Sequence, residues 1–184
     1  RLNPRQPMHQ QPQSHDQYIK ALMDISQALT SDLFLDDVFK LIVMVVAKVT
    51  GVDICSLWLV DETVSPPKVR LKATQAIEPE YVLNRSLDLN EGVVGHVIST
   101  QAPLVIADVL QCEIFKEKEM ARKLGLVSMI GVPLQGKGER VIGALNCFTS
   151  APHEFSRTDL TLLTAVANQA AVAIITTELI IKTR

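Results

Sequence analysis

The stretch Gly125–Ser150, GLVSMIGVPLQGKGERVIGALNCFTS, decides the fold that this sequence predicts. Two apolar runs flank the GKG sequence at residues 136–138, which is typical of a β-hairpin with a short glycine-containing loop. A hairpin on a single core would turn a polar face to water, but both faces of this one carry apolar residues. We therefore expect other parts of the chain to cover the hairpin on both sides.

The register of this hairpin sets which residues share a face. Pairing Gln135 with Glu139 places Met129 opposite Leu145 on an oily face. The second face would mix two polar residues with apolar ones: Ser128, Asn146, Ile130, Val132, Ile142, Ala144 and Phe148. Because side chains alternate along a strand, a slip of one residue would exchange the two faces.

The composition indicates one soluble globular domain. The 184 residues are 47% hydrophobic and 21% charged, with a formal net charge of -2, so no basic surface for nucleic acid is visible. We find no apolar run near the roughly 18 residues of a membrane span and no signal peptide. Three widely spaced cysteines, Cys55, Cys112 and Cys147, favour neither a disulfide framework nor a zinc site. We expect a cytoplasmic location.

Both ends of the sequence suggest a piece of a longer protein. Residues 1–15 are rich in Pro, Gln and Arg and predict a disordered leader or linker. Residues 16–176 form the predicted domain, and residues 177–184 would start a helical linker to a missing downstream region. An effector domain attached there is the expected covalent partner.

Hydrophobic periodicity and turn residues predict an α/β fold of the α+β type. We expect the chain to start with two helices, one from near residue 16 and one over 36–50, followed by strands over 53–61 and 68–76. The middle would hold a short strand, a helix that begins at residues 91–92, a short strand over 104–107 and a helix over 113–125. The hairpin and a helix from residue 156 to about 181 would complete the domain.

The last helix is apolar nearly all round. Ser156 and Asp159 approximate a capping box at its start. A 3-4 seam runs along it through Leu160, Leu163, Ala167, Ala170, Ile174, Thr177 and Ile181. We expect this seam to meet a second copy of the chain in a homodimer, with a stripe of the first helix adding Ile19, Leu22 and Leu29. The alternative is a core helix of a monomer.

The alternation of the first strand extends the two faces of the hairpin. An oily face would hold Cys55, Leu57, Leu59, Met129, Leu145 and Cys147 beneath the terminal helices. Residues 86–125 would then roof the other face over a pocket for an unidentified small molecule. The expected lining is Ser56, Trp58, Ile106, Phe115, Ser128, Ile130 and Asn146, with His96 and Asp108 at the rim.

Four motifs in order resemble a GAF domain over residues 18 to 176. They are SLWLVD, LNEGVVGHVISTQAPLVIADV, SMIGVPLQGKGERVIGALNCF and HEFSRTDLTLLTAVANQAAVAI. The resemblance implies an antiparallel sheet of five or six strands, with terminal helices on one face and a ligand pocket on the other. It is nearest to the GAF modules of nitrogen-related phosphotransferase enzyme I and of nitrogen-fixation activators.

The resemblance implies a non-catalytic sensory or regulatory module of a bacterial signalling protein, with no cofactor and no metal. One alternative is a dimerisation scaffold with an empty pocket. Another is a free methionine sulfoxide reductase, which needs cysteines clustered in the roof, where only Cys112 lies. Bilin attachment is disfavoured because Glu113 follows Cys112, and cyclic-nucleotide binding because the signature of that subfamily does not follow Asn84. Haem binding is disfavoured because His96 is the only histidine in the predicted pocket region. The glycines of EGVVG serve either as an anion cradle or, as we favour, in a turn and in close packing.

Overall fold

The computed structural model describes residues 16, 17, 19, 32–75, 85–136, 138 and 140–182. Six antiparallel strands form one sheet in the order β3-β2-β1-β6-β5-β4. Their bounds are β1 Ile54–Asp61, β2 Lys68–Thr74, β3 Ser86–Asp88, β4 Leu104–Ile106, β5 Ser128–Gln135 and β6 Val141–Thr149. The predicted α/β class and antiparallel sheet are confirmed.

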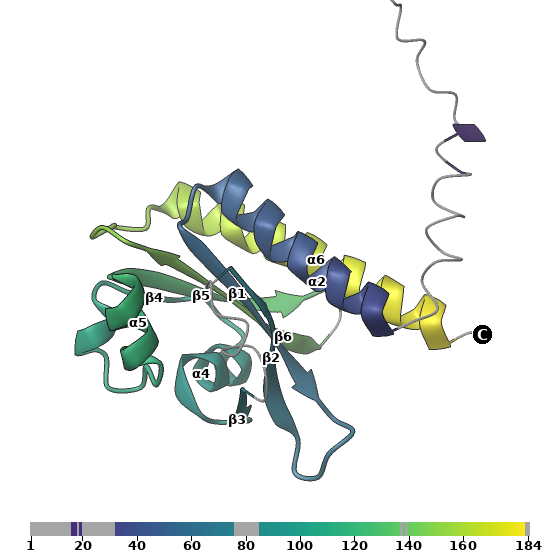
Figure 1. Ribbon diagram of the computed structural model, residues 1–184, viewed down its shortest axis with the longest axis horizontal. Coiled ribbons are helices and arrows are strands. Elements are labelled where there is room, and N and C mark those ends of the chain that lie inside the picture. Colours follow the sequence, from purple (N-terminus) through teal and green to yellow (C-terminus); the bar gives the residue numbers. More distant parts are fainter. Residues whose placement is uncertain are drawn as a thin grey trace, which may run out of the picture.

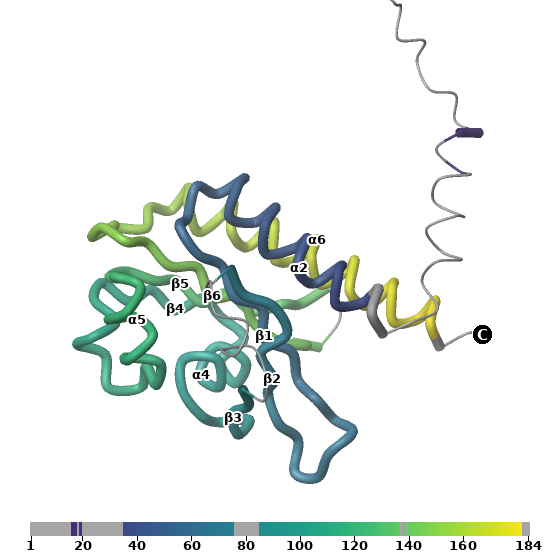
Figure 2. The backbone as a smooth tube through the Cα atoms, viewed as in Figure 1, coloured from purple at the N-terminus to yellow at the C-terminus, as the bar shows by residue number. Residues whose placement is uncertain are grey.

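Helices cover both faces of this sheet. Figure 1 and Figure 2 show α2 (Asp32–Thr50) and α6 (Arg157–Lys182) side by side over one face. A roof covers the other face. It spans residues 89–126 apart from β4 and includes α4 (Gly92–Thr100), the 3-10 helix η1 (Val109–Gln111) and α5 (Lys118–Leu124). One apolar cluster fills each interface, so the prediction of two covered faces is confirmed.

The two long helices end where local chemistry predicts. Gly51 adopts a φ of 76° and its N–H bonds to the Ala47 carbonyl, which closes α2. The capping box of α6 is present, because the Asp159 N–H donates to Ser156 Oγ and the Ser156 N–H donates to Asp159 Oδ2. That N–H, together with the His153 ring, lowers the pKa of Asp159.

Two helix predictions need comment. The predicted helix over 113–125 begins only at Lys118, because Phe115 is buried under the roof and the preceding segment follows an irregular path. Lys118 Nζ donates to the carbonyls of Cys112 and Phe115, which holds this segment in place. The first predicted helix lies mostly outside the described residues: Ile19 is helical and exposed, but Leu22 and Leu29 are not described.

The predicted hairpin register is wrong. Met129 pairs with Phe148 rather than Leu145, and Ser128 pairs with Thr149 rather than Asn146. The register also breaks between Leu134 and Gln135, so the strands do not meet as regularly as the GKG sequence suggested. Because the error is an odd number of residues, it exchanges the two faces of β5. The faces of β1 are as predicted, and so are those of β6 except at Ile142, which packs in the cluster beneath α2 and α6.

The exchange moves residues between the two cores. Met129 lies under the roof, whereas Ile130 and Val132 pack beneath α2 and α6. Cys55 and Cys147 lie beneath the same helices, as predicted.

The seam of α6 packs within its own chain. Leu163, Ala167, Ala170 and Ile174 are buried against the sheet and α2, and Leu160 is half-buried beside them. The prediction that this seam lies open for a second chain is therefore wrong. The alanines explain the difference, because small side chains let the helix approach the sheet closely.

The expectation that no apolar run approaches the length of a membrane span is wrong, because α6 is long and apolar enough over Arg157–Ile181, by length and composition only, with a mean hydropathy of 1.6. This is weak evidence of a span, because a core helix of a soluble protein meets the same criterion. In α6 the buried share of this apolar window is 28%, and buried residues such as Ala167 and Ile174 lie on the inner face.

Asp61 at the end of β1 contributes to the stability of the domain at neutral pH, and this contribution is lost in acid. Hydrogen bonds from Thr63 Oγ1, Arg70 Nε and the Thr63 N–H lower the pKa of Asp61 to about 2. A carboxyl group with a depressed pKa stabilises the fold above its unfolded-state value near 3.8, and this stabilisation disappears as the pH falls to about 2.

We therefore expect Asp61→Asn to lower the free energy of unfolding at pH 6. The difference between wild type and variant should shrink between pH 4 and about 2. Urea denaturation of both proteins at several pH values measures it. A difference that does not vary with pH would contradict the assignment to the Asp61 carboxylate.

Candidate functional site

Asn146 is the central polar residue of the sheet. It lies on β6 opposite Ser56 of β1 and Gly131 of β5, and only 5% of its surface is exposed. A Cβ atom built on Gly131 would be 3.1 Å from Asn146 Oδ1 and 3.0 Å from Val97 of α4. The Asn146 side chain therefore points from the sheet towards the roof.

The Oδ1 atom of Asn146 has no hydrogen-bond partner among the described residues. Leaving a buried acceptor unpaired costs about 1 to 3 kcal/mol. An amide group can both donate and accept hydrogen bonds, so Asn146 could orient a small polar molecule between the sheet and α4. We take this position as the candidate ligand site.

Several residues of the predicted lining lie in the same layer as Asn146, between the sheet and the roof. Trp58, Ile106 and Phe115 belong to one buried cluster under the roof, and the Phe115 and Phe148 rings pack edge to face at 5.9 Å. Ser56 is buried opposite Asn146, but its hydroxyl already bonds Thr74 Oγ1 at 2.8 Å. Asn146 is therefore the more available polar partner.

Two predicted lining residues lie elsewhere. Ile130 packs beneath the helices on the opposite face, for the reason of register given above. Ser128 Oγ donates to the Ala107 carbonyl at 2.7 Å and accepts from the His153 N–H at 3.0 Å. Ser128 thus joins β5 to the loops before η1 and α6, and its place in the lining is corrected.

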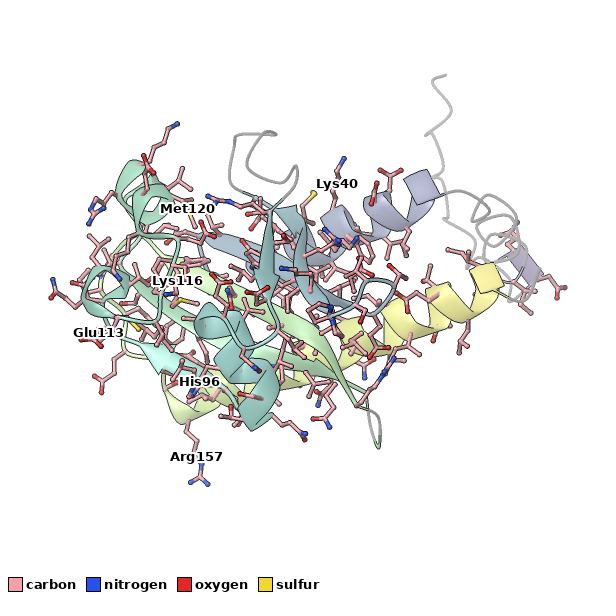
Figure 3. The ribbon with its side chains drawn as sticks, turned by 90° about the horizontal axis from the view of Figure 1, so that it is seen from below. Lys40, His96, Glu113, Lys116, Met120 and Arg157 are labelled. Carbon is pink, nitrogen blue, oxygen red and sulfur yellow. The ribbon has the colours of Figure 1, made fainter. Side chains whose placement is uncertain are left out.

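The two predicted rim residues are separated from Asn146. Asp108 accepts from the Leu110 N–H and caps η1. His96 is exposed on α4 and borders an open depression of about 510 Å³ that also includes Asn90 and Lys116. Figure 3 labels His96 on this helix and Lys116 in the segment leading to α5. The depression lies on the roof rather than beneath it.

The glycines of the EGVVG motif have structural roles. Gly92 adopts a φ of 71°, and a Cβ atom on Gly95 would be 2.5 Å from the Asn90 carbonyl carbon. Gly95 thus permits a close backbone approach at the start of α4. These contacts favour the turn and packing interpretation of the motif.

Sequence reasoning missed the inner face of α4. Val93 and Val97 are buried, and both lie within 3.3 Å of a Cβ atom built on Gly131. The run GVVGHV carried the signal, but a nine-residue helix has too few turns for its buried face to be read with certainty. The roof consequently rests directly on β5 near Asn146.

The described cysteines are distributed over both faces. Cys112 is half-buried in the roof, and Cys55 and Cys147 lie on the helix side. In the described part of the chain, no group of three or more His, Cys, Asp or Glu residues is placed to hold a metal ion.

The comparisons with known proteins agree with this architecture. A family model for the GAF domain matches residues 34–174. None of the curated proteins matches the chain. Among solved structures, the chain is similar to the GAF domain of an Acinetobacter phosphoenolpyruvate-protein phosphotransferase, with 27% identity, coverage of 88% of this chain and 95% of that chain, and a TM-score of 0.66.

Two further structures share the fold. The GAF domain of a phosphoenolpyruvate-protein phosphotransferase from Coxiella burnetii is 24% identical, with coverage of 88% of this chain and 94% of that chain and a TM-score of 0.67. A free methionine-R-sulfoxide reductase from Neisseria meningitidis, in complex with its substrate, is 20% identical, with coverage of 88% and 90% and a TM-score of 0.60. The predicted resemblance to phosphotransferase GAF modules is confirmed.

Proposed function

The chain belongs to the GAF domain family, and from this membership we propose that it binds a small polar molecule beneath its roof as a non-catalytic sensory module. GAF domains are commonly sensory or regulatory parts of multidomain signalling proteins, and the phosphotransferase relatives fit that pattern. The observation that carries the proposal is the unpartnered, buried Oδ1 atom of Asn146. A bound donor would remove the cost of leaving it unpaired.

We expect a thermal-shift screen of small polar metabolites to find a stabilising compound. A ligand at 100 times its dissociation constant adds about 2.7 kcal/mol, or roughly 5 to 10 °C in a domain of this size. Asn146→Leu should abolish this response. In the absence of ligand the same variant should be more stable than wild type by about 1 kcal/mol, because it removes the unpaired acceptor.

The matched control is Asn90→Leu, which makes the same change at an exposed residue of the roof. This variant should keep the response to the compound. If Asn90→Leu loses the response and Asn146→Leu keeps it, the ligand occupies the outer depression and the proposed site is wrong. A screen that finds no stabiliser would favour the scaffold described next.

A dimerisation scaffold without a ligand is the second candidate. It is favoured by the direct contact of α4 with β5, where Val97 lies 3.0 Å from a Cβ atom built on Gly131. Under this alternative Asn146→Leu still raises stability, but no compound binds. The two candidates therefore predict different results for the thermal-shift screen. They predict the same rise in stability for Asn146→Leu without ligand.

A reductase like the Neisseria protein has less support. Such chemistry needs an attacking thiolate and a second thiol close enough to resolve the sulfenic acid. Cys112 is the only described cysteine in the roof, and the sheet separates it from Cys55 and Cys147. We therefore propose no enzymatic activity.

We further propose that the module is a homodimer through its outer helix face. This face is defined by exposed apolar residues on α2 and α6: Leu41, Met44, Val45, Val49, Leu162, Val172 and Leu179. Met44 and Leu179 are 58% and 56% exposed. Burial of such side chains against a second copy would form a four-helix bundle about a two-fold axis.

The ligand and the dimer would be coupled through the sheet. The roof and the two helices pack on opposite faces of the same strands, so a ligand that shifts β6 favours one arrangement of the helices over another. We propose that the change passes along α6 to an attached effector domain in the cytoplasm, without nucleic acid or membrane as a partner.

A further inference from the structure

Cys55 and Cys147 face each other at the centre of the sheet. They are directly paired residues of β1 and β6, the two middle strands, and their sulfur atoms are 3.9 Å apart. Neither residue has any exposed surface. Both lie in the cluster beneath α2 and α6, on the other side of the sheet from Asn146.

The backbone around this pair is suited to a covalent link. The Cys55 N–H donates to Gln75 Oε1, and the Cys55 carbonyl accepts from the Gln75 N–H. Both backbone groups of Cys55 therefore turn away from β6, which makes Cys55 and Cys147 a non-hydrogen-bonded pair. Cα atoms in such pairs are about 4.5 Å apart, within the range of about 4.4 to 6.8 Å found for disulfides.

We propose that Cys55 and Cys147 are a redox modification site, which a small hydroperoxide converts from a dithiol to a cross-strand disulfide. One thiolate attacks an oxygen of the hydroperoxide, so that an S–O bond forms, the O–O bond breaks and an alcohol or water leaves. The second thiol then attacks the sulfenic sulfur, an S–S bond forms and water leaves. The two thiols lose two electrons, and the hydroperoxide gains them.

The surroundings favour a neutral product. The two thiols share a hydrogen bond, which together with burial raises the pKa of Cys55 well above its usual value. Cys55 therefore rests as a neutral thiol in an apolar core. A disulfide is also neutral, whereas a soft metal held by two thiolates would bring charge into this core.

Burial sets the rate of the reaction. A thiol with no exposed surface and a raised pKa meets an oxidant only when the sheet or the helix layer opens. Half-buried Cys112 should react first. The site would thus record sustained oxidation rather than a brief exposure, and it is independent of the ligand proposed beneath the roof.

Hydrogen peroxide treatment of the full chain tests the proposal, first in buffer and then in urea at the foot of the unfolding transition. Peptide mapping should find a Cys55–Cys147 disulfide that forms faster in urea and is reversed by dithiothreitol. In Cys112→Ser, oxidation should raise the melting temperature by about 5 to 12 °C, because the link closes a long loop of the unfolded chain. Cys112→Ser with Cys55→Ala should show no such rise.

The third cysteine separates native geometry from chance pairing. Cys112 is much closer in sequence to Cys147 than Cys55 is, so an unfolded chain would form the Cys112–Cys147 loop more readily. A predominant Cys112–Cys147 link, a link between two chains, or oxidation of Cys55 and Cys147 to sulfinic acids without a link would each overturn the proposal.

Discussion

Gly143→Ala should destabilise the domain by about 3 kcal/mol or more, a large part of the roughly 5 to 15 kcal/mol by which a folded domain is stable. A Cβ atom on Gly143 would lie 2.0 Å from the Trp58 carbonyl oxygen and 3.0 Å from Leu59 Cα. These atoms belong to the backbone of β1, the strand next to β6 at the middle of the sheet, so the contact cannot be relieved by a side-chain rotation. Urea denaturation followed by circular dichroism would measure the loss.

Gly138→Ala is the matched control for this substitution. Gly138 lies in the loop of the same hairpin, has a φ of 72° and has no atom within 4 Å of the position of an added Cβ. Its replacement should cost only the left-handed conformation, about 1 to 2 kcal/mol. Gly143 does not share this left-handed conformation, so equal losses from the two variants would contradict the prediction that the contact with Trp58 makes Gly143→Ala the more costly change.

Met44→Glu should convert the proposed homodimer to a monomer. Burial of an apolar side chain of this size contributes about 1.5 to 3 kcal/mol, and a two-fold axis repeats the substitution on both chains. The summed loss of about 3 kcal/mol or more corresponds to at least a 100-fold weaker dimer. Sedimentation velocity over a range of micromolar concentrations would measure the change, with circular dichroism to confirm that the variant stays folded.

Ile114→Glu provides the matched control, because it places the same charge on an exposed apolar residue of the roof. This variant should sediment as wild type does. Leu163→Glu is unsuitable as a test, since Leu163 is buried in its own domain and a charge there would unfold it. A wild-type protein that remains monomeric at the highest concentration would contradict the proposed role of the outer helix face.

The sequence predicted the elements well where the signal was local. The apolar alternation of β1 placed Trp58 and Leu57 on the correct faces, and the capping box at Ser156 located the start of α6. It predicted the register of the hairpin poorly. A loop with two glycines permits several pairings, and the register shifts between Leu134 and Gln135 at the end of the strand that leads into this loop.

The candidate site shows the same division. Asn146 shares a sheet face with Trp58, as the alternation of side chains predicted, but the faces of Ser128 and Ile130 depended on the hairpin register. The faces of α6 were also ambiguous. Two stripes of this helix are apolar, and only the inner stripe carries the buried alanines. Alanines in a stripe can indicate either a close contact with another helix or a close approach to a sheet. Only the three-dimensional packing decides between them.

The antiparallel arrangement of α2 and α6 has a consequence for how such a module can be exchanged between proteins. Leu35 near the start of α2 and Ile181 near the end of α6 border the same groove, so the chain enters and leaves the domain at one end. Domains whose connections lie close together can be inserted into a host without separating the parts on either side. This domain could therefore be transplanted as a cassette, because its removal would leave a short gap for a linker to close.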